Sequence, residues 1–122
     1  MTDEDSLARF IKSAFRSIWS LELLLLVRAR PDHGWSHDEL IGALRASEQV
    51  LAGGIADLQA AGLVAADGER LRYEPGSAAQ ARTVDEVARL YAARPTKVRR
   101  LIVGGEDQLT RFADAFRLRG DK

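Results

Sequence analysis

Two histidines with neighbouring aspartates are the first residues in this chain whose types suggest chemistry. His33 and His37, beside Asp32 and Asp38, carry the imidazole and carboxylate groups that bind transition metals. A helical metal site needs ligands one turn apart on one helix, whereas His33 precedes Ser36, the expected cap of the next helix. We therefore expect no metal and no other cofactor at these residues.

Glu22 is the other candidate for chemistry, because it lies inside the most apolar run of the chain, residues 21–27. A lone carboxylate without a second acid, a nucleophile or a metal does not make a reaction centre. The sequence has no cysteine, no arrangement of Ser, His and Asp that is typical of a catalytic triad, and no glycine-rich phosphate loop. We expect Glu22 to pair with an arginine or to reach an exposed edge, and we expect the protein not to be an enzyme.

Length and composition favour one small folded unit. The chain has 122 residues, enough for a single core with an appended helical segment, and 46% of them are apolar. Its start is acidic, unlike a secretory signal, and its longest apolar run is far shorter than the roughly 20 residues of a membrane span. Together with the missing cysteines, these features predict a cytoplasmic protein with no membrane contact.

The first half of the chain reads as three helices. Apolar residues recur at helical spacing from Ser6 onward, which predicts one long central helix that ends before Pro31. Ser36 with Glu39 three residues later forms a capping box, so a second helix is expected over residues 36–45. Ser47 is the expected cap of the third helix, in which an apolar stripe faces inward; the stripe is Leu51, Ile55 and Leu58.

A hairpin and further helices follow. Asp67-Gly68 between two short extended segments predicts a β-hairpin turn, with Leu71 and Tyr73 facing inward and the two neighbouring arginines outward. Thr83 to Glu86 forms a second capping box and predicts a helix there, and another helix follows Pro95 and ends at Gly104-Gly105. A last apolar stripe comprises Leu109, Phe112, Ala113 and Phe116. We divide the chain into a core, residues 1–75, and a C-terminal extension, residues 76–122.

A helix, a short turn, a second helix and a hairpin follow one another in the order of a winged helix. The stretches Trp35-Ser36-His37-Asp38-Glu39-Leu40, Leu58-Gln59-Ala60-Ala61-Gly62-Leu63-Val64 and Asp67-Gly68 resemble winged-helix transcriptional regulators of the multiple-antibiotic-resistance class, over about residues 15–75. The resemblance implies a mostly α fold with a winged helix-turn-helix core, a small β-hairpin wing and a helical C-terminal extension. It also implies transcriptional regulation by binding double-stranded DNA.

Few side chains on the expected contact surface suit DNA. Gln49 is the one hydrogen-bonding group on the face of the third helix opposite its apolar stripe, and it would favour adenine. The stretch 32–69 holds seven acids and a single arginine, which opposes the neutralisation of phosphates. If DNA is bound, we expect five residues to carry the contact: Arg45, Ser47, Gln49, Arg70 and Arg72.

A second hypothesis, that the winged helix binds a protein partner, rests on the same helix face. Gly53, Ala56 and Ala60 leave a smooth strip on which another chain can pack, and Phe112 and Phe116 offer a further apolar surface. The long apolar first helix and this aromatic stripe also predict a homodimer. Residues 94–100 contain a basic cluster whose role the sequence does not decide: it contacts phosphate, an acidic protein or only solvent.

Overall fold

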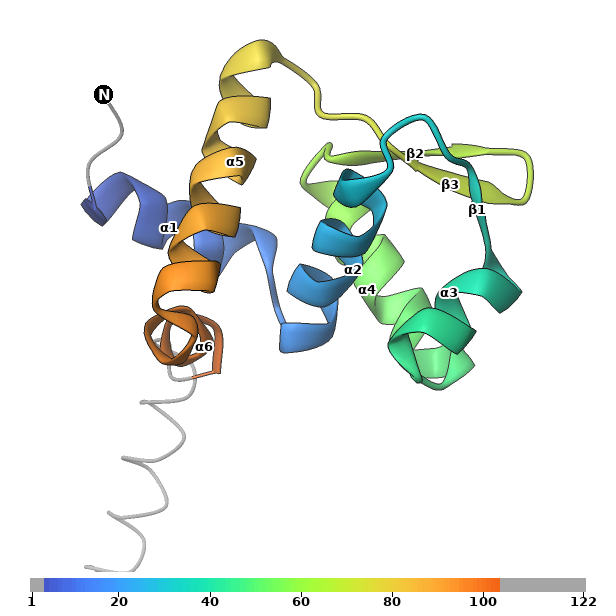
Figure 1. The fold of residues 1–122 in the computed structure, drawn as a ribbon, viewed down its shortest axis with the longest axis horizontal. Coiled ribbons are helices and arrows are strands. Elements are labelled where there is room, and N and C mark those ends of the chain that lie inside the picture. The colour runs from blue at the N-terminus through green and yellow to red at the C-terminus, as the bar shows by residue number, and fades with distance from the viewer. Residues whose placement is uncertain (1–3, 104–122) are drawn as a thin grey trace, which may run out of the picture.

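The computed structural model describes residues 4–103. In that range the chain is mostly helical, with six helices and one small antiparallel sheet of three strands (Figure 1). The coarse expectation of a helical protein with a small β element is therefore confirmed. No helix in this range is long and apolar enough to cross a membrane.

The N-terminal helix that the sequence predicts as one is two helices, α1 (Glu4–Ala14) and α2 (Ile18–Ala29). Ser17 has an extended backbone (φ −152°, ψ 163°), and its hydroxyl accepts a hydrogen bond from the Ser20 N–H at 3.3 Å, which caps α2. Serine competes in this way with the hydrogen bonds of a helix interior, and apolar spacing does not reveal that competition. The prediction of a single helix was wrong for this reason.

The predicted helix pair is confirmed as α3 (His37–Leu44) and α4 (Glu48–Ala60). The capping box forms, because the Ser36 N–H donates to Glu39 Oε1 at 2.8 Å and the Glu39 N–H donates to Ser36 Oγ at 3.2 Å. Ser47 caps α4, its hydroxyl accepting a backbone N–H at 3.1 Å. Both helix starts were readable because a capping side chain acts within three residues of itself.

A small sheet joins the segment before α3 to the hairpin after α4. β2 (Val64–Asp67) and β3 (Arg70–Tyr73) form the predicted hairpin, and β1 (Trp35–Ser36) pairs with the other edge of β3, giving the order β1-β3-β2. With two residues, β1 is too short for an alternating pattern to reveal it in the sequence. Leu71 faces the core as predicted and is buried.

The hairpin turn lies one residue later than predicted. Asp67 still pairs with Arg70, so the two loop residues are Gly68 and Glu69 rather than Asp67 and Gly68. Of these two loop residues, only Gly68 has a positive φ, of 65°. A two-residue turn that needs a positive φ at its first position alone takes glycine there, and the aspartate can remain in the strand.

α5 (Ala78–Ala93) begins more than a turn before its predicted start at Thr83. Ser77 caps the helix, while Thr83 lies inside it and donates its hydroxyl to a backbone carbonyl at 3.1 Å. The side chain of Gln80 donates to the Ala61 carbonyl at 2.8 Å and so ties the first turn of α5 to the end of α4. This long-range bond favours the earlier start, and a local capping pattern does not include it.

α6 (Pro95–Val103) confirms the helix expected after Pro95. The expected helix end at Gly104-Gly105 and the last apolar stripe, with Phe112 and Phe116, lie outside the described residues.

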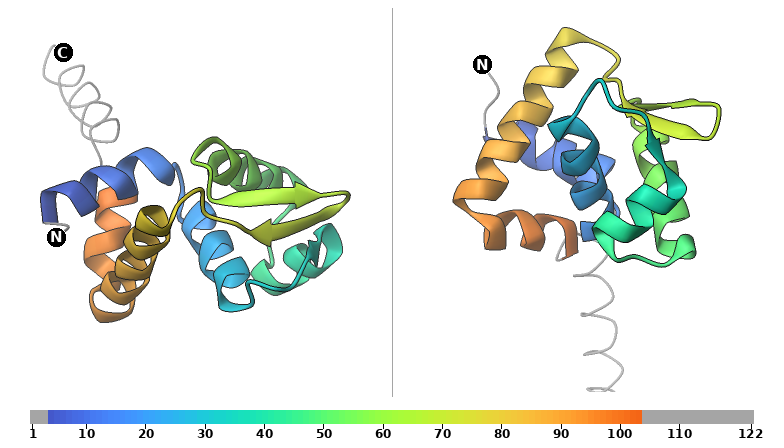
Figure 2. Two further views of the ribbon diagram at one scale, coloured as in Figure 1. Left: turned by 90° about the horizontal axis from the view of Figure 1, so that it is seen from above. Right: turned by 45° about the vertical axis from the view of Figure 1, so that its right-hand side comes forward.

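One hydrophobic core runs through the described chain, with α2 at its centre. The cluster of buried residues extends from Ile11 in α1 to Val98 in α6. Figure 2 shows α1, α5 and α6 on one side of α2, and α3, α4 and the sheet on the other. α2 contributes most to the core through four fully or almost fully buried side chains: Leu21, Leu23, Leu24 and Val27.

α2 and α4 cross closely at Gly54. A Cβ added there would lie 3.4 Å from Leu23 Cδ2 and 3.8 Å from Ser20 Cα, in ordinary van der Waals contact, so a side chain larger than that of alanine would push the helices apart. The buried Ser20 hydroxyl donates to Asp57 Oδ2 at 2.5 Å across the same crossing. Asp57 therefore faces the N-terminus of α2, where the helix dipole favours a negative charge.

Candidate nucleic-acid interface

The outer face of α4 is the face opposite its apolar stripe, where the sequence predicts contact with a ligand. Gln49, Gly53, Ala56 and Ala60 are all exposed, as their position opposite the apolar stripe predicts. A Cβ added at Gly53 would meet nothing within 4 Å. The face is thus a shallow strip of small side chains, with the Gln49 amide near its N-terminal end.

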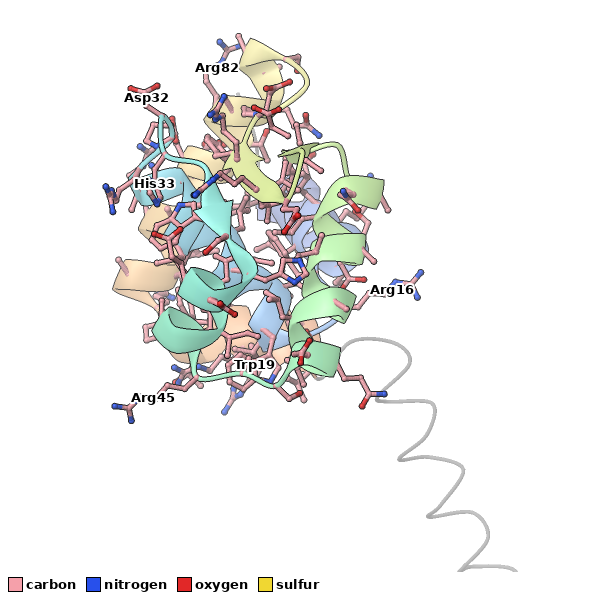
Figure 3. All side chains as sticks on the ribbon, turned by 90° about the vertical axis from the view of Figure 1, so that its right-hand side faces the viewer. Arg16, Trp19, Asp32, His33, Arg45 and Arg82 are labelled. Carbon is pink, nitrogen blue, oxygen red and sulfur yellow. The ribbon has the colours of Figure 1, made fainter. Side chains whose placement is uncertain are left out.

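Three of the predicted DNA-binding residues lie together at the turn between α3 and α4. Arg45 ends α3 in a left-handed conformation (φ 57°), and its exposed side chain extends away from the body of the molecule (Figure 3). Ser47 holds the first turn of α4 through its hydroxyl, and Gln49 follows on the exposed side. This end of α4 can therefore offer one guanidinium and one amide to a ligand.

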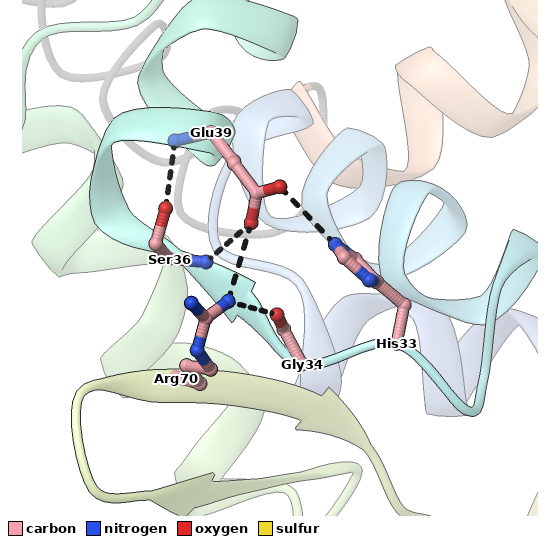
Figure 4. Close-up of polar contacts among 5 residues, drawn as sticks. All are labelled: His33, Gly34, Ser36, Glu39 and Arg70. Carbon is pink, nitrogen blue, oxygen red and sulfur yellow. Dashed lines mark hydrogen bonds and ion pairs between the residues drawn. The ribbon is translucent and has the colours of Figure 1, made fainter.

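Arg70 does not project freely from the hairpin. Its Nη1 donates to the Gly34 carbonyl at 2.8 Å and lies 3.7 Å from Glu39 Oε1 (Figure 4). Its side chain is still 58% exposed, so the ion pair is weak and can be exchanged for another anion. Part of its positive charge is nevertheless offset by Glu39 before any ligand arrives.

Arg72, the second predicted hairpin arginine, is only partly exposed. Its Nε is enclosed and has no hydrogen-bond partner in the described part of the chain. Its Nη2 lies beside Gly34, 3.5 Å from where a Cβ would stand on that residue. Both hairpin arginines therefore lean towards the segment before α3, and the exposed charges at the hairpin tip are the acids Asp67 and Glu69.

The acidic character that the sequence predicts for this region is visible at the surface. Of the seven acids between residues 32 and 69, all but Asp57 are exposed. Asp57 is half-buried and holds the Ser20 hydroxyl, so it has a structural role. The surface around α4 and the hairpin thus carries more acids than bases, which opposes strong non-specific binding to phosphates.

Glu39 is the centre of a small polar network (Figure 4). The hydrogen bond from the Ser36 N–H lowers the pKa of the Glu39 carboxyl, and His33, whose Nε2 lies 3.3 Å from Glu39 Oε2, lowers it further. These contacts stabilise the carboxylate form next to Arg70. The same side chain therefore caps α3 and restrains a predicted DNA-binding arginine.

The contacts of His33 and the exposed position of His37 show how the two histidines fit into the fold. The His33 ring packs edge-to-face on Trp35, with ring centres 4.8 Å apart, and contacts Glu39. His37 is the exposed first residue of α3. Among residues 4–103, no three His, Asp or Glu side chains come together in an arrangement that could hold a metal ion.

Glu22 takes part in a polar link between three helices. The Tyr91 hydroxyl of α5 donates to Glu22 Oε2 at 2.7 Å, and Arg99 of α6 donates to the Tyr91 oxygen at 3.3 Å. Burial raises the pKa of Tyr91, and the hydrogen bond to Glu22 raises it further. The arginine expected beside Glu22 thus reaches it through a tyrosine, and the contacts found here connect α2, α5 and α6.

The surface predicted for a protein partner can be described only in part. Gly53, Ala56 and Ala60 do form an exposed strip on α4. Phe112 and Phe116, the other predicted interface residues, lie outside the described range.

Two exposed residues near the start of α2 were missed from the sequence. Trp19 is 40% exposed at the start of α2, and Arg16 is exposed just before it. Trp19 lies at the same end as Arg45 and the α3–α4 turn (Figure 3). The assumption of one continuous helix concealed both residues, and Ser17 as a possible N-cap was the signal that could have revealed them.

Comparison with known proteins adds no family: no protein-family model, no curated protein and no solved structure matches this chain.

Proposed function

We propose that this protein is a winged-helix transcriptional regulator that binds double-stranded DNA through the outer face of α4 and the β2–β3 hairpin. The observation that carries the proposal is the exposed face of α4, which follows a short turn after α3 and precedes a hairpin. In helix-turn-helix proteins the second helix of such a pair enters the major groove.

The chemistry of the α4 face also favours a groove over a protein surface. Gly53, Ala56 and Ala60 would let the helix approach base edges closely, and the Gln49 amide suits adenine. Protein interfaces gain most of their affinity from large anchors such as Trp, Tyr and Arg, and the outer face of α4 has none of these. Arg45 would contact a phosphate at the start of the helix.

Electrostatics favour a second candidate, a winged helix that binds a protein partner. Exposed acids surround α4, and Arg70 is already engaged by Glu39. A partner that suits this surface is basic and presents a helix or strand to the small-residue strip. In this case Gly53, Ala56 and Ala60 carry the contact.

A homodimer remains part of the proposal. Two copies would present two α4 helices to two half-sites and would double the small number of cations that face DNA. Light scattering of the full chain tests this: a dimer mass at micromolar concentration is expected, and a monomer at high micromolar concentration contradicts it.

The salt dependence of DNA binding tests the main proposal. With Arg45, Arg70 and Arg72 as the cations, about three phosphates are neutralised per protomer, so log K should fall against log salt with a slope of roughly −3. The measurement is fluorescence anisotropy with labelled random duplex over a salt series. A selection from random duplex should also enrich sites that contain adenine.

Single substitutions separate the roles of these residues. Arg45→Ala should flatten the slope by about one unit, whereas Gln49→Ala should alter the selected sequence and leave the slope unchanged. Arg82→Ala, which removes an exposed charge from α5, is the matched control and should change neither. If low-salt duplex shows no binding and selection enriches no sequence, the DNA proposal fails and the protein-binding candidate replaces it.

A further inference from the structure

A basic hollow lies at the other end of the molecule, where the end of α1 meets the start of α6. It is an open depression with a volume of about 760 Å³, and four cationic residues line it: Lys12, Arg94, Lys97 and Arg100. Thr96 and Leu101 also contribute to its wall, and none of the described residues that line it is acidic. We infer that this hollow binds a small, multiply charged anion of the phosphate class.

Three of its cations have no carboxylate partner in residues 4–103. Lys12, Arg94 and Arg100 form no ion pair there, whereas Arg28 is held by Asp85 at 2.9 Å and Arg70 approaches Glu39. Like charges that converge on one concave surface repel one another, and an anion placed between them removes that repulsion. The inference rests on these three residues, and Lys97 adds to the positive field.

The shape of the hollow indicates a small ligand. Its volume falls within the roughly 300–1,000 Å³ that is usual for small-molecule sites. A nucleic-acid backbone is better served by a stripe of cations along an extended surface. The start of α6 adds the Thr96 hydroxyl and the positive end of a helix dipole, both of which favour the oxygens of a phosphate group.

The position of the hollow separates it from the proposed DNA surface. α1 and α6 lie on the opposite side of α2 from α4 and the hairpin (Figures 1 and 2). A ligand in the hollow therefore leaves the outer face of α4 uncovered. This inference goes beyond the proposed function and does not depend on it.

Calorimetric titration of the full chain with inorganic pyrophosphate tests the inference, with sodium chloride at matched ionic strength as the reference. Saturable binding of one pyrophosphate per chain is expected, and inorganic phosphate should bind more weakly. Lys12→Ala/Arg100→Ala should weaken the binding by about tenfold, because two of the cations are lost. Circular dichroism checks that this variant keeps its helical content.

A matched control variant keeps the hollow and removes the same charge elsewhere. Arg16→Ala/Arg82→Ala replaces two exposed arginines that do not line the hollow, and its affinity for pyrophosphate should stay within about twofold of the wild type. Two results would overturn the inference: no saturable binding above the chloride reference, or an equal loss in both variants. Displacement of pyrophosphate by random duplex would also overturn it, because the hollow would then hold a nucleic-acid backbone.

Discussion

The two ends of this molecule use their arginines in opposite ways. Near α4, Arg70 shares its guanidinium with Glu39 and a carbonyl, and exposed acids surround it. At the junction of α1 and α6, Arg94 and Arg100 line a hollow without a carboxylate among the described residues. The end that carries α3, α4 and the hairpin is thus the acidic one, and the end formed by α1, α5 and α6 is the basic one.

The arrangement of the helices and the placement of charge are therefore independent properties of this fold. The order of α3, α4 and the hairpin decides which face of α4 is exposed, but the affinity for a polyanion depends on cations that this order does not specify. Both ends pack against α2, so we expect them to unfold as one body.

The largest effect is expected from Leu24→Ala, which empties a fully buried site in α2 between the two ends. It should lower the free energy of unfolding by about 2–5 kcal/mol, as the loss of buried methyl groups leaves a cavity. Urea unfolding followed by tryptophan fluorescence and by circular dichroism should give one coincident transition. Leu44→Ala, at a half-buried site of α3, should lower the free energy of unfolding by less than Leu24→Ala does. If the fluorescence and circular dichroism transitions separate, the two ends fold independently.

Tyr91→Phe sharpens the comparison at the basic end. Removing the hydroxyl takes the donor away from Glu22 and should lower the free energy of unfolding by about 1 kcal/mol or less, since the site is half-exposed. The folded-state pKa of Tyr91 lies above the ordinary 10.0, so its contribution is complete below pH 10 and is lost as the pH rises through the raised value. Urea unfolding measured at increasing alkaline pH should show a smaller loss of the free energy of unfolding in the variant than in the wild type. If both proteins lose the same amount, the hydrogen bond between Tyr91 and Glu22 does not stabilise the fold.

Gly53→Ala tests the face of α4 itself. Alanine in an exposed helix interior should raise the free energy of unfolding by up to about 1 kcal/mol, because glycine loses more backbone entropy. The added methyl group should weaken DNA binding if the outer face of α4 lies in the groove. Gly42→Ala on α3 is the matched control: it gives the same gain in stability, and its DNA affinity should equal that of the wild type.

The smallest effect is expected from Glu39→Gln, which keeps the capping geometry and removes the charge beside Arg70. The pKa of Glu39 is lowered below its ordinary 4.5, so its stabilising contribution is present above that pH and is lost as the pH falls through the lowered value. The variant should therefore lose less stability in acid. It should also steepen the salt slope of DNA binding by a fraction of a unit, because the part of the Arg70 charge that Glu39 offsets becomes available to phosphate.

Glu48→Gln is the control for that last effect. It removes an exposed charge from the first turn of α4 and leaves the ion pair of Arg70 intact. If both variants change the slope equally, net charge and not the release of Arg70 explains the result.

The sequence predicted most reliably those features that depend on neighbouring residues. The capping box at Ser36, the cap at Ser47, the inward stripe of α4 and the hairpin all act over a few positions, and all are confirmed. The break at Ser17 and the early start of α5 were missed. The break was missed because a serine inside an apolar pattern can either continue a helix or cap the next one, as Ser17 does. The early start of α5 was missed because the hydrogen bond from Gln80 to Ala61 joins residues that are distant in the chain.

For the candidate site, the sequence predicted which residues are exposed on α4, but it did not predict the partners of Arg70. The exposure of Gln49, Gly53, Ala56 and Ala60 follows from helical geometry alone. The engagement of Arg70 depends on β1, which brings Gly34 and Glu39 to the hairpin, and a strand of two residues leaves no pattern to read.

The break at Ser17 also has a kinetic consequence. Because α1 is separate from α2, it packs against α5 and α6, helices from the opposite end of the described chain. Closing a loop of that length is entropically costly, and contacts distant in sequence slow folding. During synthesis α1 leaves the ribosome before α5 and α6 do, so among the described helices it should be one of the last to become protected from hydrogen exchange.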